Sequence, residues 1–187
     1  MRFKSVADCK DWAMQIGGNF SSGSFSHVFF NETKARKVFD ARETGYLKFI
    51  EAITSPEFKK LPAAVRNRFP KITKVVYFQS GKKNKVVGVE MEALKHVKPE
   101  NYRKNFRKIE WNIYCPEEIQ DMNKHDLAAI KFLNEFVTKT NKTFNRGIKF
   151  DIHDCNIMVR SNRSKIPVFT DPVVVNEWSE ISNEMFC

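Results

Sequence analysis

Residues that favour strands and residues that favour helices are segregated along this chain, and their order restricts the possible folds more than any other feature. Residues 20–30 and 72–91 each combine β-branched and aromatic residues with a central turn, so both predict hairpins. Between them, residues 35–39 predict a strand, and residues 42–53 predict a helix with apolar residues at helical spacing. A long amphipathic helix is expected later, over residues 123–144. This order predicts an α+β fold.

The change from strands to helices near residues 92–94 also indicates how the chain is organised. A chain of 187 residues fits one domain or two small lobes that share a cleft. We expect a β-rich N-terminal lobe over residues 1–94, beginning with a helix over residues 5–16, and a reduced helical C-terminal lobe over residues 95–187. The second lobe is expected to contain short strands at residues 148–152, 157–160 and 166–170.

Composition restricts the cellular setting and the partners. No apolar run approaches the roughly 20 residues of a membrane-spanning helix, and the first residues lack the apolar core of a signal peptide, so we expect a cytoplasmic protein without a membrane partner. The net charge of +10 favours anionic partners, nucleic acid among them, but the lysines are dispersed and form no nucleic-acid-binding motif. The cysteine spacing matches no zinc site, so free thiols are expected at Cys9, Cys115, Cys155 and Cys187.

The segment over residues 149–160 concentrates polar side chains between apolar, strand-type residues. Asp151, His153, Asp154 and Asn156 all fall within it. Burying such a loop is costly unless each polar group has a partner. The ordinary alternative for Asp151 and His153 is a capped turn with a core histidine, and Asp154 is expected to be a solvated turn residue. The density of polar groups nevertheless makes this segment the first candidate for a functional site.

A second polar position, Asp171, follows the last of the short strands expected above. The turn over residues 161–165 allows the strands at 157–160 and 166–170 to pair as a hairpin. Asn156 and Asp171 would then lie near each other at its open end. Their side-chain oxygens suit Mg²⁺, which takes few protein ligands and completes its coordination with phosphate oxygens and water. The sequence therefore predicts a magnesium site at this end of the hairpin.

The pattern Asp151-x-His153-x-x-Asn156, followed by Asp171, resembles the catalytic loop and metal-binding aspartate of protein-kinase-like phosphotransferases. The resemblance implies a two-lobed fold with ATP and Mg²⁺ as cofactors. It also implies that Asp151, with His153 in the same catalytic loop, accepts the proton of the substrate hydroxyl, while Asn156 and Asp171 hold the metal. Lys149 stands where the usual His-Arg-Asp or His-Gly-Asp motif has its histidine, so the support of this loop is expected to differ.

The first half contains residues that suit the nucleotide end of such a site. Gly23, Ser24 and Phe25 are similar to the tip of a glycine-rich loop, whose backbone N–H groups approach phosphates. Lys37, on the next strand, stands where the resemblance implies a phosphate-pairing lysine. Glu43 matches the start of the helix that follows. It is therefore expected to hold Lys37 by an ion pair.

Glu51, two helical turns further along, is the alternative partner for that lysine. Glu92 and Leu94 fall where the hinge between the lobes would lie, so their backbone is expected to meet the adenine. Over about residues 17–175 these motifs together resemble the early serine/threonine protein kinases of T-odd-type podophages. The resemblance implies a phage-encoded kinase that acts on proteins of the host cell, in the host cytoplasm.

Two departures from the kinase pattern keep other functions open. The usual Asp-Phe-Gly is Asp171-Pro172-Val173 here, so no phenylalanine-driven activation switch is expected. Only residues 172–187 follow Asp171, which leaves substrate recognition unexplained and motivates the alternative of a pseudokinase or binding module that captures a host protein. A kinase for small molecules and a nucleic-acid-binding protein are further alternatives.

Overall fold

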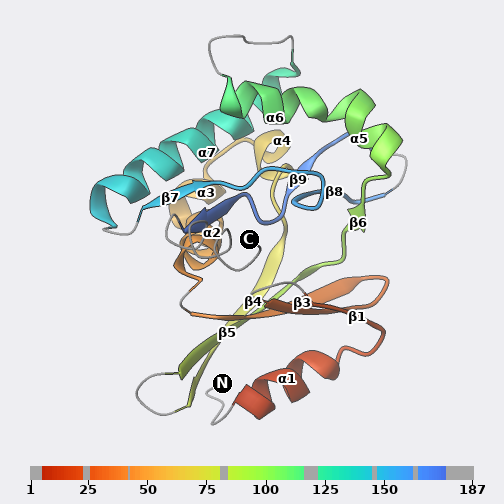
Figure 1. Cartoon of the computed structure of the whole chain (residues 1–187), viewed down its shortest axis with the longest axis vertical. Coiled ribbons are helices and arrows are strands. Elements are labelled where there is room, and N and C mark those ends of the chain that lie inside the picture. Colours follow the sequence, from red (N-terminus) through yellow and green to blue (C-terminus); the bar gives the residue numbers. More distant parts are fainter. Residues whose placement is uncertain are drawn as a thin grey trace, which may run out of the picture.

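The fold is α+β, with an antiparallel sheet and the first helix towards one end of the molecule and the other helices towards the opposite end (Figure 1). The computed structural model describes residues 6–22, 26–41, 43–80, 84–115, 122–144, 147–161 and 164–175. The helices are α1 (Val6–Met14), α2 (Thr44–Thr54), α3 (Pro56–Lys59), α4 (Ala63–Arg66), α5 (Pro99–Asn105), α6 (Arg107–Tyr114) and α7 (Lys124–Thr143). The strands are β1 (Asn19–Ser22), β2 (Ser26–Phe30), β3 (Lys34–Asp40), β4 (Ile72–Ser80), β5 (Asn84–Glu92), β6 (Lys95–His96), β7 (Ile148–Phe150), β8 (Ile157–Val159), β9 (Val168–Phe169) and β10 (Val173–Val175).

The main sheet has five strands in the order β1-β2-β3-β5-β4, and every neighbouring pair is antiparallel. Both hairpins predicted from the sequence are confirmed, as β1–β2 and as β4–β5. The predicted strand and helix between them are confirmed as β3 and α2. Helix α2 separates β3 from β4 in the chain. In the sheet, β5 lies between these two strands, so β4 is an outer strand and does not pair with β3.

Successive side chains of β3 point to opposite faces of the sheet, which gives the two faces different roles. Helix α1 covers one face, where Cys9, Trp12 and Ala13 pack against Val38 and other residues of the sheet. The predicted helix is therefore confirmed, and Gly17 and Gly18 follow it with φ of 69° and 94°, the left-handed backbone that glycine adopts without strain.

The other face of the sheet belongs to a larger core, which contains residues from both halves of the chain. Aromatic rings from distant segments meet in it: Phe69 lies against Phe49 of α2 at 6.2 Å, against Phe58 of α3 at 5.3 Å and against Phe169 of β9 at 5.8 Å between ring centroids. Each of these side chains is less than a tenth exposed. Burial of this kind stabilises each large apolar side chain by roughly 1.5–3 kcal/mol, so this core fixes the helices against the sheet.

The second half is mainly helical, with short strands near the middle of the molecule (Figure 1). Strands β8 and β9 form the predicted hairpin, in which Ile157 pairs with Phe169, and β6 adds to the other edge of β8. The sequence did not predict β6 or β10. Strand β10 pairs with β7, so that Val173 lies opposite Phe150. The two pairings bring both ends of the polar segment 151–156 against the residues around Asp171.

Two expectations about the whole chain are tested by the described residues. None of their helices combines the length and the apolar character needed to cross a membrane. Cys9, Cys115 and Cys155 are free thiols, as expected, and Cys187 lies outside the described residues. Burial raises the pKa of the Cys9 thiol to about 12, so this thiol stays protonated and acts as a small apolar side chain.

Candidate functional site

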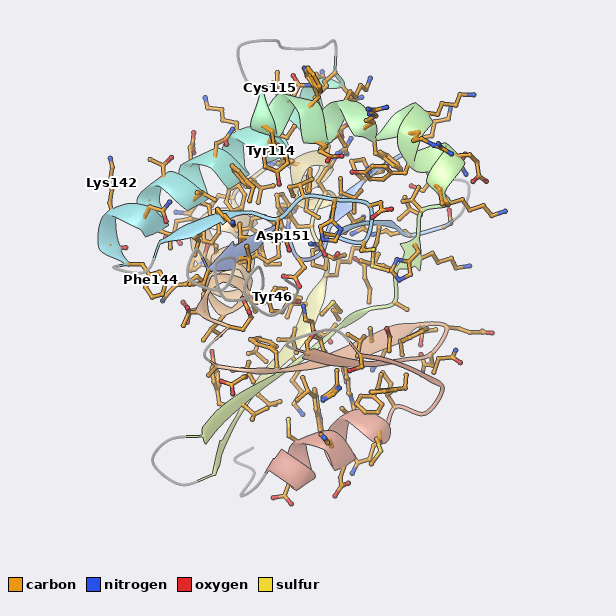
Figure 2. The ribbon with its side chains drawn as sticks, in the orientation of Figure 1. Tyr46, Tyr114, Cys115, Lys142, Phe144 and Asp151 are labelled. Carbon is orange, nitrogen blue, oxygen red and sulfur yellow. The ribbon has the colours of Figure 1, made fainter. Side chains whose placement is uncertain are left out.

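The polar segment lies against the strand-to-strand connection that carries Asp171. The Asp151 amide donates a 2.9 Å hydrogen bond to the Pro172 carbonyl, just beyond the β7–β10 pairing. On its other side the segment is held by α6, because the Ile152 amide donates to the Tyr114 hydroxyl at 3.0 Å. In the view of Figure 2, Asp151 lies between Tyr114 of α6 and Tyr46 of α2. The backbone of Asp151 is therefore fixed from two elements.

Asn156 closes this loop and orients the Asp151 side chain. Its side-chain amide donates to the Asp151 carbonyl at 2.7 Å and to Asp151 Oδ2 at 3.1 Å. The same amide nitrogen lies 2.9 Å from His153 Nε2. The side chains of Asp151 and His153 are nearly half exposed, so the alternative of a core histidine is wrong. Asp154 is exposed, as expected for a turn residue.

The predicted closeness of Asn156 and Asp171 follows from the β8–β9 hairpin. Thr170, the residue before Asp171, donates to the Asn156 carbonyl through its amide at 3.0 Å and through its hydroxyl at 3.1 Å. These bonds hold the two chain segments together at the open end of the hairpin. Asp171 follows immediately, with its side chain one-third exposed. Asn156 and Asp171 thus lie at one place in the fold, as the hairpin argument predicts.

Lys37 reaches this end of the hairpin from the main sheet. Its Nζ lies 2.5 Å from Asp171 Oδ2. It also lies 3.7 Å from the ring centroid of Tyr46, a cation–π distance. Lys37 is only 9% exposed, so it is not the solvent-facing lysine that a strand edge would carry. A cation from the sheet and the carboxylate that follows a distant hairpin therefore form one partly buried contact.

The expected ion pair between Glu43 and Lys37 is absent from the described residues, and Asp171 takes that place. Glu43 precedes α2 and is 8% exposed, with no hydrogen-bond partner for its Oε2. Burial, followed by the neighbouring charge of Asp171, raises the pKa of Glu43 to about 7. The alternative partner, Glu51, is wrong as well, because it pairs with Lys48 on the surface at 2.8 Å. Glu43 nevertheless lies in the site, since the charges of Lys37 and Asp171 both act on it.

Close packing of α2 against β10 explains where Glu43 and Tyr46 lie. A Cβ atom on Gly45 would come within 3.3 Å of the Val174 backbone, so the helix start approaches the strand as closely as glycine permits. This contact places the Tyr46 ring beneath Lys37. Tyr46 is 1% exposed and its hydroxyl has no partner. The sequence suggested no role for Tyr46. Tyr46 follows Glu43 by three residues, a spacing at which helical side chains lie near each other, and this spacing could have indicated Tyr46 as a neighbour of the site.

Glu92, which was expected in the hinge between the lobes, forms an ion pair that the sequence did not predict. Both oxygens of Glu92 accept hydrogen bonds from Arg160, at 2.7 and 2.9 Å. The Glu92 amide donates to the Lys71 carbonyl at 3.1 Å, while the Leu94 amide has no backbone partner in the described part of the chain. Of the two residues expected to meet the adenine, Leu94 is thus the one whose amide remains available. Gly23, Ser24 and Phe25, expected at the phosphates, lie outside the described residues.

No protein-family model matches this chain, and no curated protein matches it in sequence.

The side chains of the site themselves indicate which ligands it can bind. Asp151, Asn156 and Asp171 offer oxygen atoms of the kind that hard divalent cations bind. Lys37 supplies a positive charge at the same place, and Glu43 leaves a buried oxygen unused. Buried polar atoms without partners are uncommon in folded proteins. This combination of oxygens, one cation and unused polar atoms suits a ligand that is itself anionic and carries a metal ion.

Proposed function

We propose that this chain is an ATP- and Mg²⁺-dependent phosphotransferase with a two-lobed, protein-kinase-like fold that phosphorylates serine or threonine in proteins. The observation that carries the proposal is the contact between Lys37 and Asp171. A lysine on the third strand of the sheet meets an acid that follows the Asp151–Asn156 loop by a short hairpin. These are the positions, in the same chain order, that protein kinases use for phosphates, metal and proton transfer.

The residues present fit an Mg²⁺-bound triphosphate. Asn156 and Asp171 lie together at one end of a hairpin and would hold the metal, while Lys37 would pair with phosphate oxygens. The bound metal and the lysine neutralise charge on the phosphates, which is the largest contribution that such sites make to phosphoryl transfer. The Lys37 side chain would then exchange part of its contact with Asp171 for contact with phosphate, while the Tyr46 ring keeps it in place.

Asp151 is the residue proposed to accept the proton of the substrate hydroxyl. Its side chain is nearly half exposed, so a hydroxyl group can approach it from solvent. Asn156 donates to Asp151 Oδ2, which leaves Oδ1 for the incoming hydroxyl. His153 lies 3.8 Å from Asp151 Oδ2 through its Nε2 and is proposed to keep the carboxylate oriented. General-base catalysis of this kind contributes about 10²–10⁴-fold to the rate.

The proposed lobes are residues 1–94 and 95–187, with the adenine near Glu92 and Leu94. Support comes from the position of β5, which ends at Glu92 and directly precedes the crossing into the helical half. The acceptor proteins are proposed to be host proteins of a phage-infected cell, and the enzyme is proposed to act in the cytoplasm. This part of the proposal rests on the resemblance of the sequence motifs to podophage kinases.

A transfer assay with ATP labelled in the γ-phosphate tests the proposal. Wild-type protein with Mg²⁺ is expected to label itself or proteins of a bacterial extract, and Asp151→Asn is expected to lose about 10²–10⁴-fold in rate. The exposed Lys48→Gln variant is the control and should retain the wild-type rate. Absence of labelling by wild type under all acceptor conditions, with the protein folded, would overturn the proposed activity.

A second candidate, a pseudokinase that captures a host protein, is favoured by one observation. Lys37 already has two partners, Asp171 and the Tyr46 ring, and it forms no ion pair with Glu43, the residue before α2. In this alternative the closed Lys37–Asp171 contact is permanent. Asp151→Asn would then leave the biological effect of the protein unchanged, whereas an active kinase would lose it.

A further inference from the structure

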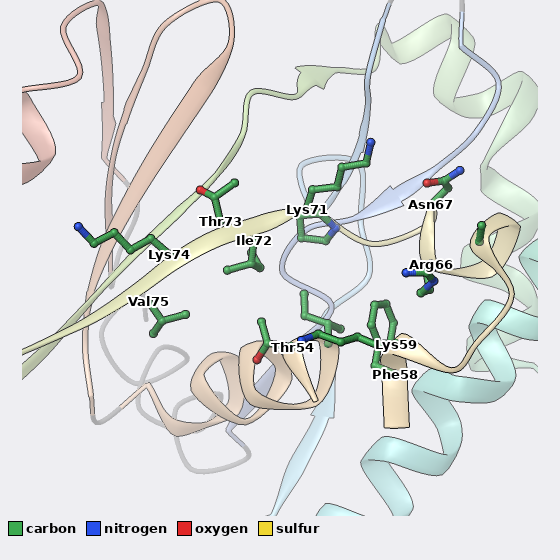
Figure 3. Close-up of a pocket in the computed structure, with 13 residues that line it drawn as sticks. Thr54, Phe58, Lys59, Arg66, Asn67, Lys71, Ile72, Thr73, Lys74 and Val75 are labelled. Atoms are coloured by element: carbon green, nitrogen blue, oxygen red, sulfur yellow. The ribbon is translucent and has the colours of Figure 1, made fainter. Parts of the chain in front are cut away.

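A hollow of about 550 Å³ lies between β4 and the helices α2, α3 and α4 (Figure 3), and the amide of Lys71, which lines it, donates a 2.9 Å hydrogen bond to Glu92 Oε1. Its volume falls in the range of ordinary binding sites. In Figure 3, Ile72 and Val75 extend from β4 towards α2, and Thr54 lies opposite them. Phe58, from α3, also lines the hollow, which gives it an apolar floor.

Only positive charges surround this floor. Lys59 and Arg66 line the hollow from the helices, and Lys71 and Lys74 line it from the side of β4. No carboxylate lines it, and none of these basic side chains has an ion-pair partner among the described residues. The nearby acids Glu90 and Glu92 are neutralised elsewhere, by Arg36 and Arg160. A cluster of like charges around an apolar surface favours an anionic ligand with an apolar part.

The free edge of β4 supplies the third element of the hollow. β4 is an outer strand of the sheet, and its backbone pairing within the described chain is with β5 alone. Four consecutive residues of β4, Ile72 to Val75, line the hollow, and the pairing of β4 with β5 shifts register between Ile72 and Lys74. This irregularity interrupts the usual alternation of side chains, so neighbouring residues of the outer strand line the same hollow. An open edge of this kind accepts an added strand through backbone hydrogen bonds.

Lysines on an outer strand also protect a sheet from aggregation, which would account for Lys71 and Lys74 without any ligand. That explanation does not require Lys59 and Arg66, which come from two separate short helices and line the same hollow. Protection against aggregation also does not explain why apolar side chains lie beside the strand edge. Positive charge on both sides, apolar surface between them and an open strand edge together describe a groove for a peptide.

We propose that this hollow binds an extended, acidic segment of a partner protein, which pairs with the edge of β4. Its backbone forms hydrogen bonds with β4, its apolar side chains cover Ile72, Val75 and Phe58, and its carboxylates pair with the surrounding lysines and arginine. Nucleic acid fits the groove less well, because the floor offers no exposed aromatic ring on which a base could stack; Phe58 is only 7% exposed. The site is independent of the proposed phosphotransfer activity and does not require ATP.

Fluorescence anisotropy with a labelled eight-residue peptide of alternating glutamate and valine tests this proposal. Saturable binding is expected, with roughly tenfold weaker affinity for Lys59→Glu/Lys71→Glu. The double variant Lys131→Glu/Lys139→Glu, on the exposed side of α7, makes the same change in net charge and should bind as wild type does. Melting curves establish that each variant is folded.

Two further probes separate the occupants. A peptide with N-methyl groups at alternate residues retains the charges but loses hydrogen bonds to the strand edge, and should bind about tenfold more weakly. The proposal is wrong if the peptide does not bind, or if both charge-reversal variants weaken its binding equally. It is also wrong if a single-stranded oligonucleotide binds more tightly than the peptide and at the same lysines. It is also wrong if a peptide of this chain's own residues 176–187 displaces the probe and binds more tightly, or if light scattering detects a dimer that Lys59→Glu/Lys71→Glu dissociates.

Discussion

Two ionic contacts join the sheet to the second half of the chain, and they differ in how completely their polar groups are used. Arg160 binds both oxygens of Glu92 and also donates to the carbonyls of Asn67 and Phe69. Lys37 has a single hydrogen bond, to Asp171, and rests on the Tyr46 ring. Beside Lys37, Glu43 Oε2 and the Tyr46 hydroxyl are buried without partners.

This difference distinguishes a contact that stabilises the fold from a contact that belongs to a functional site. Arg160 makes a bidentate pair with additional hydrogen bonds, the arrangement that gives a partly buried ion pair its best geometry. The Lys37 contact leaves polar groups unused, which costs stability. A buried polar group without a partner in the protein can be satisfied by a ligand, an ion or a water molecule. We therefore expect substitutions at Arg160 to affect mainly stability, and substitutions at Lys37 to affect mainly activity.

The largest expected effect is on activity, at Lys37. Lys37→Met should lower the rate of phosphoryl transfer by about 10²–10³-fold, because a positive charge beside the phosphates is lost. The free energy of unfolding should fall by about 1 kcal/mol, because Asp171 loses its partner but its carboxylate is one-third exposed and can be hydrated. Transfer assays and urea unfolding on the same preparations measure both quantities. A large loss of stability with little loss of rate would reverse the roles assigned to the two contacts.

The next effect is on stability, at Arg160. Arg160→Met should lower the free energy of unfolding by about 3 kcal/mol, because Glu92 and two backbone carbonyls lose their partners. Urea unfolding measures this loss directly. If the variant is as stable as wild type, the contact between Glu92 and Arg160 is not structural, and the comparison fails on that side.

The sequence predicted the helices and strands better than the contacts between side chains in the site. Turn residues and apolar periodicity are local signals, and they predicted the two hairpins as well as β3 and α2. The pairing of Asn156 with the region of Asp171 was predictable because one short hairpin connects them.

The partners that were missed depend on how the two halves pack. Glu43 was expected to pair with Lys37, but Asp171, 134 residues along the chain from Lys37, takes that place. Arg160 and Glu92 are likewise 68 residues apart. Strand β10 was missed because its partner β7 is distant in sequence, so its short valine run carried no turn signal. Local patterns hold no information about such contacts.

A third effect is a pH dependence that comes from Glu43. Its pKa is about 7 in the folded chain and is near 4.5 in the unfolded chain, so the folded chain holds this proton more tightly. Between about pH 4.5 and pH 7 the unfolded chain ionises first, and stability falls as the pH rises. Glu43→Gln removes this contribution. The stability of wild type relative to Glu43→Gln should therefore fall by about 3 kcal/mol between pH 4.5 and pH 8.

Urea unfolding at a series of pH values, on both proteins, measures this difference. Glu51→Gln, on the exposed part of the same helix, is the matched control and should follow the wild-type curve. A constant difference between wild type and Glu43→Gln across the range would mean that the pKa of Glu43 is the same in the folded and the unfolded chain. The buried oxygen would then belong to an ordinary solvated carboxylate, and the contrast between the two contacts would weaken.

The smallest effect is expected at the surface pair between Lys48 and Glu51. Both side chains are 46% exposed. Removing the pair by Lys48→Gln should change the free energy of unfolding by less than about 0.5 kcal/mol and leave transfer activity unchanged. A larger change in either quantity would show that α2 is sensitive along its whole length, and not only where it meets Lys37 and β10.

The central claim is that Lys37, Asn156 and Asp171 form one site for a Mg²⁺-bound nucleotide. Isothermal titration of a non-hydrolysable ATP analogue into wild type, with Mg²⁺ and with a chelator, tests it most directly. We predict binding that requires Mg²⁺ and is lost in Asp171→Asn, while Arg160→Met, under conditions where it remains folded, still binds. Binding that is equal with and without Mg²⁺, or that Asp171→Asn retains in full, would contradict the claim.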